Sequence, residues 1–213
     1  KKSPISRGFP IEKAYDPETI IAWAMNGNDI PLANGYPLRL ICPGFPGSTS
    51  GKWLERISIR NQVHDGTKMG GYAYRLPCNP VAPGEKPTPD EMCIIEEMPV
   101  KSLITYPKND LEIKEGEAFH IRGKAWSGSG FVSKVYTSID FGITWQEAKL
   151  KDARNKFSWR RWENNINFPK KGYYEVWVRA VDSLGRSQPM VLPGWNPKGY
   201  LNNASHRIAL KVV

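Results

Sequence analysis

The pattern that most constrains the fold is a series of short alternating segments that begins near Met98 and continues to Val213. In these segments apolar and polar side chains alternate with a period of two, which is typical of β-strands that bury one face. Turn sequences separate them, as in Ser127-Gly128-Ser129-Gly130. Frequent short strands between turns predict an all-β, immunoglobulin-like sandwich over residues 98–213. The clearest segments are Phe119–Gly123, Lys134–Ile139, Tyr174–Ala180 and Arg207–Val213.

Residues 1–97 have less periodicity and longer loops. Asp16, followed by Pro17, is a typical helix start and predicts a short helix over 16–25. Apolar runs predict strands over 36–42 and 52–59. The stretch from 61 to 98 is rich in proline and predicts a long irregular segment. The first part is therefore expected to be α+β within a mostly β protein.

The chain is basic, with a formal net charge of +9 and a pI of about 9.4. A basic surplus favours anionic partners, namely phosphates, oxyanions, acidic proteins or nucleic acid, and a solvated basic surface is the simpler alternative. Trp159-Arg160-Arg161-Trp162 could stack on bases, but core packing in a strand explains it better, and no nucleic-acid reader motif is present. No segment approaches the roughly 18 apolar residues of a membrane span.

Cysteine and histidine patterns indicate no metal site. Three cysteines without a CxxC pair predict neither a disulfide framework nor a zinc site, although Cys78 and Cys93 flank a proline-rich loop and could pair. Cys42 lies in an apolar run and is expected to be a small core residue. The three histidines stand far apart in the sequence, without metal-ligand spacing.

Two groups of residues suit the binding of anions. Arg39, the Gly- and Ser-rich turn 48–51 and Lys52 combine exposed backbone N–H groups with cations, as in phosphate sites. An ordinary connection between strands is the alternative, and the spacing is not that of a nucleotide P-loop. Tyr74 and Arg75 place a phenol beside a guanidinium, which could hold an oxyanion, or else the aromatic ring simply packs in a loop.

Three stretches resemble the sulfite oxidase family of molybdenum enzymes, which includes bacterial sulfite dehydrogenases and plant nitrate reductases. The first contains Ala24-Met25-Asn26-Gly27, Gly35-Tyr36-Pro37-Leu38-Arg39-Leu40 and Gly51-Lys52-Trp53-Leu54. The second contains Gly123-Lys124-Ala125-Trp126-Ser127-Gly128 and Asp140-Phe141-Gly142-Ile143-Thr144-Trp145. The third contains Trp195-Asn196-Pro197-Lys198-Gly199-Tyr200 and Asn202-Asn203-Ala204-Ser205-His206-Arg207.

The resemblance implies how the chain is organised. Residues 1–97 would be the latter part of a molybdopterin-binding domain, and residues 98–213 the dimerisation domain. None of the cysteines stands in the context of the family's molybdenum ligand. The metal-binding thiolate is therefore expected outside this chain, in an N-terminal half with which the chain would assemble.

The resemblance also implies site residues. Arg39 matches a cofactor-binding arginine, and Ser50, Gly51 and Lys52 match the segment that contacts the pterin phosphate. Asn34 stands where a cofactor-binding histidine is frequent. Tyr74 matches the active-site tyrosine, with Tyr72 as the alternative. Arg75 and Lys198 would attract the substrate dianion, and Lys198 replaces an arginine found in some members.

The function implied is a molybdopterin-dependent oxidation of sulfite to sulfate, with electrons passed to a cytochrome or another acceptor. Such an enzyme would be a homodimer, and the resemblance to bacterial members suggests the periplasm. The alternatives are a non-catalytic β-sandwich module for dimerisation or interaction, and a related molybdoenzyme with another oxyanion or sulfur substrate. A nucleic-acid-binding role is the least supported hypothesis.

Overall fold

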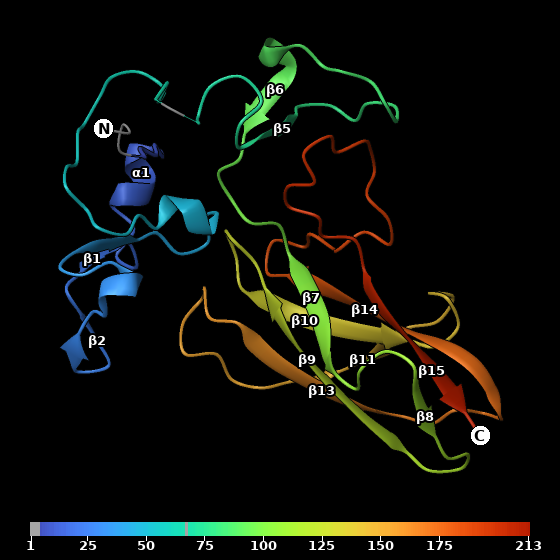
Figure 1. The fold of residues 1–213 in the computed structure, drawn as a ribbon. Coiled ribbons are helices and arrows are strands. Elements are labelled where there is room, and N and C mark those ends of the chain that lie inside the picture. Colours follow the sequence, from blue (N-terminus) through green and yellow to red (C-terminus); the bar gives the residue numbers. More distant parts are fainter. Residues whose placement is uncertain (1–4, 67) are drawn as a thin grey trace. The chain divides into compact units, whose positions relative to one another are not determined.

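The computed structural model describes residues 5–66 and 68–213. The chain forms two compact units, drawn in Figure 1. Unit 1 comprises the residues up to Met98 together with the segment Gly194–Tyr200, and unit 2 comprises Pro99–Pro193 and Leu201–Val213. A segment from the C-terminal half of the sequence is thus part of the N-terminal unit.

Unit 2 is a sandwich of two β-sheets. The strand order of the five-stranded sheet is β11-β10-β14-β15-β8, and that of the four-stranded sheet is β12-β13-β9-β7. All neighbours are antiparallel except β15 and β8. The strands are β7 (Lys101–Tyr106), β8 (Leu111–Ile113), β9 (Phe119–Trp126), β10 (Val132–Ser138), β11 (Gln146–Glu147), β12 (Lys149–Leu150), β13 (Arg160–Ile166), β14 (Gly172–Asp182) and β15 (His206–Val212). The all-β, immunoglobulin-like prediction is confirmed.

The core of the sandwich follows from the alternation of its strands. In β9, Ile121 and Ala125 are fully buried, while Arg122 and Lys124, which alternate with the buried positions, face outward. Trp162 of β13 fills the centre at 1% exposure. Gly123 must lack a side chain, because a Cβ there would lie 2.0 Å from the Leu103 carbonyl oxygen and 2.3 Å from the Trp162 ring. The prediction that the two tryptophans of the Trp159–Trp162 stretch pack in the core is therefore confirmed for Trp162 and wrong for Trp159, which is 59% exposed because it lies before β13 and stacks on Trp126.

Unit 1 is made of short elements joined by loops. Its strands form three antiparallel pairs, β1 with β4, β2 with β3 and β5 with β6. The elements are α1 (Ile11–Ala14), β1 (Ile20–Ala22), β2 (Ala24–Met25), β3 (Asn28–Asp29), the 3-10 helix η1 (Leu32–Asn34), β4 (Arg39–Ile41), η2 (Gly47–Thr49), β5 (Arg75–Pro77), η3 (Pro89–Glu91) and β6 (Met92–Ile94).

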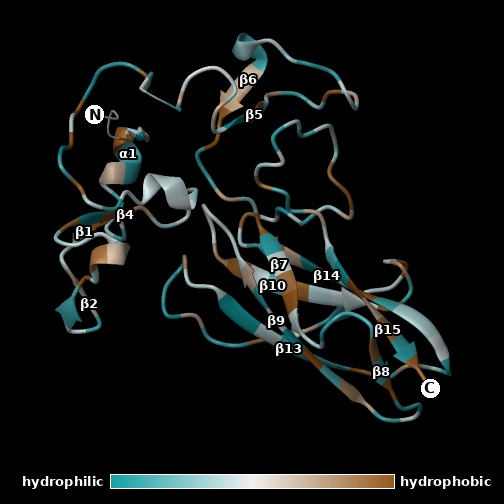
Figure 2. Ribbon diagram, in the orientation of Figure 1, coloured by the Kyte–Doolittle hydropathy of each residue, from teal (hydrophilic) through white to brown (hydrophobic). Residues whose placement is uncertain are grey.

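Two elements of the first part were predicted wrongly. The stretch 16–25 is not a helix, because the β-branched Ile20 and Ile21 pair with β4. These two side chains remain nearly half exposed, and Figure 2 shows the apolar colour of β1. The stretch 52–59 is not a strand, because Trp53 has a positive φ of 52° and the alternating residues after it find no partner strand. The predicted strand over 36–42 is confirmed in its centre as β4.

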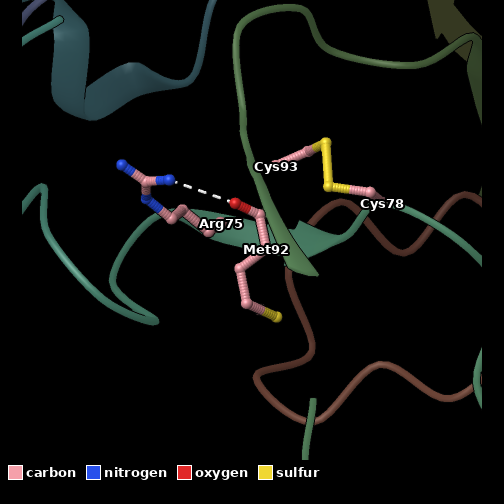
Figure 3. The surroundings of a disulfide bond; sticks show 4 residues. All are labelled: Arg75, Cys78, Met92 and Cys93. Carbon is pink, nitrogen blue, oxygen red and sulfur yellow. Dashed lines mark hydrogen bonds between the residues drawn. A yellow bond between two sulfur atoms is a disulfide. The ribbon is translucent and has the colours of Figure 1, made fainter. Parts of the chain in front are cut away.

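The pairing of Cys78 with Cys93, which the sequence left open, is present, although no disulfide framework was predicted. Cys78 and Cys93 are bonded at the loop end of the β5–β6 hairpin, as Figure 3 shows. The register places Cys93 opposite Leu76, so that the Cα atoms of the two cysteines lie 5.0 Å apart. Spacing alone could not reveal this, because the pairing depends on the hairpin. Cys42 is the free cysteine and is buried, as expected. In the described part of the chain, no helix is both long and apolar enough to traverse a lipid bilayer.

Candidate functional site

Arg39 of β4 is held by backbone carbonyl groups rather than by acids. Its Nη1 donates to the Asn34 carbonyl at 2.9 Å and its Nη2 to the Ser50 carbonyl at 3.3 Å. Its Nε is buried and has no hydrogen-bond partner. A guanidinium that is held by carbonyl groups and has no carboxylate partner keeps its positive charge uncompensated and is suited to an anion.

Lys52 approaches the same turn from the other side. Its Nζ donates to the Ala33 carbonyl at 2.8 Å and lies 5.2 Å from the centre of the Trp53 ring. Gly35 allows this approach, because its φ is +116° and an added Cβ would lie 3.0 Å from Cβ of Lys52. The cation is thereby fixed beside the Leu32–Asn34 turn.

Ser50 and Gly51 connect the two cations through the backbone. The Ser50 hydroxyl accepts a hydrogen bond from the Cys42 amide at 3.0 Å, and the Gly51 carbonyl accepts one from the Leu40 amide at 2.8 Å. The structure thus brings the predicted cofactor-binding residues together, and we call them the cation cluster: Asn34, Arg39, Ser50, Gly51 and Lys52. Asn34 contributes its backbone carbonyl to the interaction with Arg39. Within residues 5–66 and 68–213, no carboxylate forms an ion pair with Arg39 or Lys52.

Tyr74 occupies a strained and closely packed position. Its φ is +55°, which is unusual for a residue with a side chain. The Arg7 guanidinium lies 4.4 Å from the centre of its ring, and the Tyr200 ring stacks on it at 5.5 Å. The Tyr72 hydroxyl, in contrast, donates to the Pro87 carbonyl at 2.9 Å. The geometry therefore favours Tyr74 over Tyr72 as the tyrosine that is available to a ligand.

Arg7 and Tyr200 were not among the residues that we expected in the site. Tyr200 stands at the end of the Trp195–Tyr200 motif, two residues after Lys198. Its place in this motif was the signal that could have identified it as a site residue. Arg7 carried no signal, because nothing in its neighbourhood links it to a tyrosine that is 67 positions later in the sequence. Only the folded unit reveals the stack.

Arg75 follows Tyr74 and points into the β5–β6 hairpin. Figure 3 shows its side chain donating to the Met92 carbonyl, at 3.0 Å from Nη1. Its Nη2 lies 3.5 Å from the Met69 carbonyl oxygen, and its Nε is buried without a partner. The guanidinium of Arg75 therefore stabilises the hairpin, and its attraction of a substrate stays a prediction.

Lys198 lies in the Gly194–Tyr200 segment, which is anchored to the loop that the disulfide closes. The Trp195 amide donates to the Val81 carbonyl at 2.9 Å, and a Cβ on Gly194 would lie 3.0 Å from Pro80. The Asn196 side chain hydrogen-bonds to the Tyr200 carbonyl. Lys198 itself is exposed, two residues before the tyrosine that stacks on Tyr74.

The thiols of this chain are poorly suited to bind a metal. Burial raises the pKa of the Cys42 thiol, against the opposing charge of Lys13, and Cys78 and Cys93 are oxidised to a disulfide. In the part of the chain that the structure describes, no three His, Cys, Asp or Glu side chains gather to hold a metal ion.

Two family models match the chain. Residues 92–213 match the Mo-co oxidoreductase dimerisation domain, and residues 1–68 match the oxidoreductase molybdopterin binding domain. Mitochondrial sulfite oxidases of Rattus norvegicus and Homo sapiens are 34% and 36% identical to 96% of this chain. The inducible NADH nitrate reductase of Glycine max is 32% identical over 94% of it. The chain spans 39%, 38% and 24% of the lengths of these relatives.

A solved structure agrees with this relationship. The sulfane dehydrogenase SoxCD of Paracoccus pantotrophus superimposes with a TM-score of 0.77 and 28% identity, over 95% of this chain and 51% of that one. The motifs, the matched domains and the fold lead to the same assignment. The chain belongs to the family of molybdopterin-binding Mo-co oxidoreductases, as its resemblance to sulfite oxidases implied.

Proposed function

We propose that this chain is the C-terminal portion of a molybdopterin-dependent enzyme that oxidises sulfite to sulfate and passes the electrons to a cytochrome or another acceptor. The observation that carries the proposal is the cation cluster, in which Arg39 and Lys52 converge without an acidic partner. Sulfite oxidases and a sulfane dehydrogenase among the similar proteins support a sulfur substrate.

The residues present fit the phosphate end of a molybdopterin. Arg39 supplies one positive charge, and Lys52 supplies a second at the same turn. The cofactor, when bound, would supply the two-electron oxo-transfer chemistry. The cation cluster would hold and neutralise its anionic group, and the molybdenum ligand would come from the N-terminal half of the enzyme.

Tyr74 would act on the substrate side of the site. Its hydroxyl makes no hydrogen bond to the described residues, and Arg7 and Tyr200 both pack against its ring. A phenol held in this way can donate a hydrogen bond to an oxyanion without reorganising. Lys198 would attract the dianion as an exposed cation, and Arg75 would add charge from the hairpin.

The test uses the full-length enzyme. Arg39→Gln and Lys52→Gln should each lower the molybdenum and pterin content, whereas Arg56→Gln, an exposed arginine of the same unit, should leave it unchanged. Sulfite-dependent reduction of cytochrome c by the wild type is expected, with Tyr74→Phe slower at full cofactor content. A full-length protein without molybdopterin contradicts the proposal. A preference of the enzyme for nitrate or a sulfane substrate would replace sulfite oxidation by the related reaction on that substrate.

We also propose that the enzyme is a homodimer in the periplasm. The dimerisation-domain match over residues 92–213 supports the dimer. The Cys78–Cys93 disulfide supports an oxidising compartment, because such bonds are rare where thiols are kept reduced. Cell fractionation, combined with alkylation of free thiols after acid quenching, should find the disulfide in the periplasmic fraction. A cytoplasmic protein with reduced cysteines would refute this location.

A further inference from the structure

The surplus of positive charge is concentrated in one unit. Unit 2 contains 18 Lys and Arg against 10 Asp and Glu, a net charge of +8, whereas unit 1 contains 12 against 11, a net charge of +1. The cation cluster and Tyr74 belong to unit 1. Anions bound at the proposed catalytic site therefore do not explain why the chain is basic.

Within unit 2, cations gather on the outward side of the four-stranded sheet. We call the outward residues of β12, β13, β9 and β7 the cationic face. Arg161 lies directly opposite Lys124, and Lys101 lies opposite Trp126. Like charges directly opposite on neighbouring strands destabilise a sheet. The charged residues of this face are Lys101, Arg122, Lys124, Lys149, Arg161 and Glu163.

Glu163 is the single carboxylate among these outward strand positions. It pairs across the sheet with Arg122 on one side and Lys149 on the other, and forms an ion pair with Lys151. A hydrogen bond from Lys151, together with the charges of Lys151, His120 and Lys149, lowers the pKa of Glu163. The carboxylate is thus surrounded by positive charge that it cannot balance.

Exposed aromatic residues accompany the cations. The Trp159 ring, 59% exposed, stacks on Trp126 with 4.6 Å between ring centres. The Arg122 guanidinium lies 5.0 Å from the centre of the Tyr106 ring, which is 39% exposed. Tryptophan, tyrosine and arginine are enriched at the energetic centres of protein interfaces. Solubility would need only the charges and not the exposed rings.

The outward side of the other sheet has a different character. Its cations are largely neutralised by ion pairs between Lys134 and Glu147, Arg207 and Glu175, and Lys211 and Glu112. Arg179 lies over the Tyr136 and Trp145 rings. Two sheets of one sandwich thus share a core but differ in outward charge, so the cationic face is not a general property of this unit.

We propose that the cationic face docks a partner protein with an acidic surface. The same face of a second copy does not fit, because it would present the same positive charge. A nucleic acid fits less well, because the sequence contains no nucleic-acid reader motif. Such docking accelerates association through long-range attraction and is sensitive to salt.

The test measures binding of the full-length protein to a polyglutamate peptide and to an oligothymidylate of the same length. At low salt, the Arg122→Glu, Lys124→Glu, Arg161→Glu variant should associate with polyglutamate at least about tenfold more slowly than the wild type. The control variant Lys114→Glu, Lys170→Glu, Lys171→Glu carries the same net charge change on exposed turns and should differ from the wild type by less than about threefold.

Fluorescence locates the contact. Polyglutamate should change the tryptophan emission of the wild type, and Trp159→Phe should remove most of that change. If the charge reversal prevents folding, the Arg122→Gln, Lys124→Gln, Arg161→Gln variant is measured instead. Its association with polyglutamate should also be slower than that of the wild type, by a smaller factor. Equal losses in both charge variants, no binding at all, or tighter binding of oligothymidylate than of polyglutamate would overturn the proposal. The assay needs no molybdenum and no sulfite, so its outcome is independent of the proposed catalysis.

Discussion

The two units of this chain are stabilised in different ways. In unit 2, the alternating strands bury a continuous apolar cluster around Ile121, Trp162 and Val176. In unit 1, the strands have two or three residues each, and large apolar side chains such as Trp23 and Leu32 are about 70% exposed. Unit 1 depends instead on individual links: a disulfide, arginines bonded to carbonyl groups and stacked rings.

This difference agrees with the proposed organisation of the chain. A continuous core stabilises a sandwich whose outer faces are free to vary. The links of unit 1 each fix one side chain or one turn, and several of these belong to the candidate site. Because unit 1 is proposed to be the latter part of a larger domain, its exposed apolar side chains are expected to pack against the proposed N-terminal half.

The largest expected effect tests the core of unit 2. Trp162→Ala should lower its free energy of unfolding by about 3–5 kcal/mol, because the ring is buried at the centre of the sandwich. Trp159→Ala should cost about 1 kcal/mol or less, since this ring is exposed and loses mainly its stacking on Trp126. Chemical denaturation followed by circular dichroism measures both. Similar losses in the two variants would mean that the core is not the source of stability.

The second prediction concerns the disulfide of unit 1. Replacing Cys78 and Cys93 by Ser removes a closure over a sequence separation of 15 residues, which should cost about 3 kcal/mol. The loss should be local, with faster hydrogen exchange in β5 and β6 and unchanged exchange in the sandwich strands. Equal acceleration in β9 and β14 would contradict the distinction between the two units.

The third prediction concerns the stack on Tyr74. Arg7→Gln should lower kcat/KM for sulfite by about 3- to 10-fold with the cofactor retained, because the cation over the ring is worth roughly 1 kcal/mol. Arg7→Lys should recover part of the loss, since a positive charge over the ring is retained. The fold should be intact in both variants, as judged by their thermal unfolding. No difference between the Gln and Lys variants would exclude the contribution of the charge.

The smallest expected effect is a dependence of stability on pH. Burial, with the charge of Lys101, lowers the pKa of His206, and its Nδ1 lies 3.2 Å from the Ile104 amide. The unfolded chain then binds a proton more readily than the folded one. Unit 2 should therefore lose stability as the pH falls through the unfolded value of about 6.5. Urea unfolding between neutral and mildly acidic pH measures this, and His206→Gln should lessen the dependence.

The sandwich could be predicted from sequence because its signal is local and repeated. Alternation in β9, β10, β14 and β15 encodes both the strand and the buried face. Unit 1 has no such signal, and Ile20 and Ile21 were assigned to a helix because helix-start chemistry precedes them. Of the site, the cation cluster followed from motifs close together in the sequence. The Arg7–Tyr74–Tyr200 stack and the disulfide did not, because each depends on segments that only folding brings together.

The Gly194–Tyr200 segment has a consequence for the way such enzymes can be rearranged. It leaves the sequence of the sandwich, lies in unit 1 and supplies the ring that covers Tyr74. A chimera that joins residues 1–98 of one relative to the sandwich of another would therefore also exchange part of the site. The boundary at residue 98 therefore does not separate all the residues of the proposed site from the sequence of the sandwich.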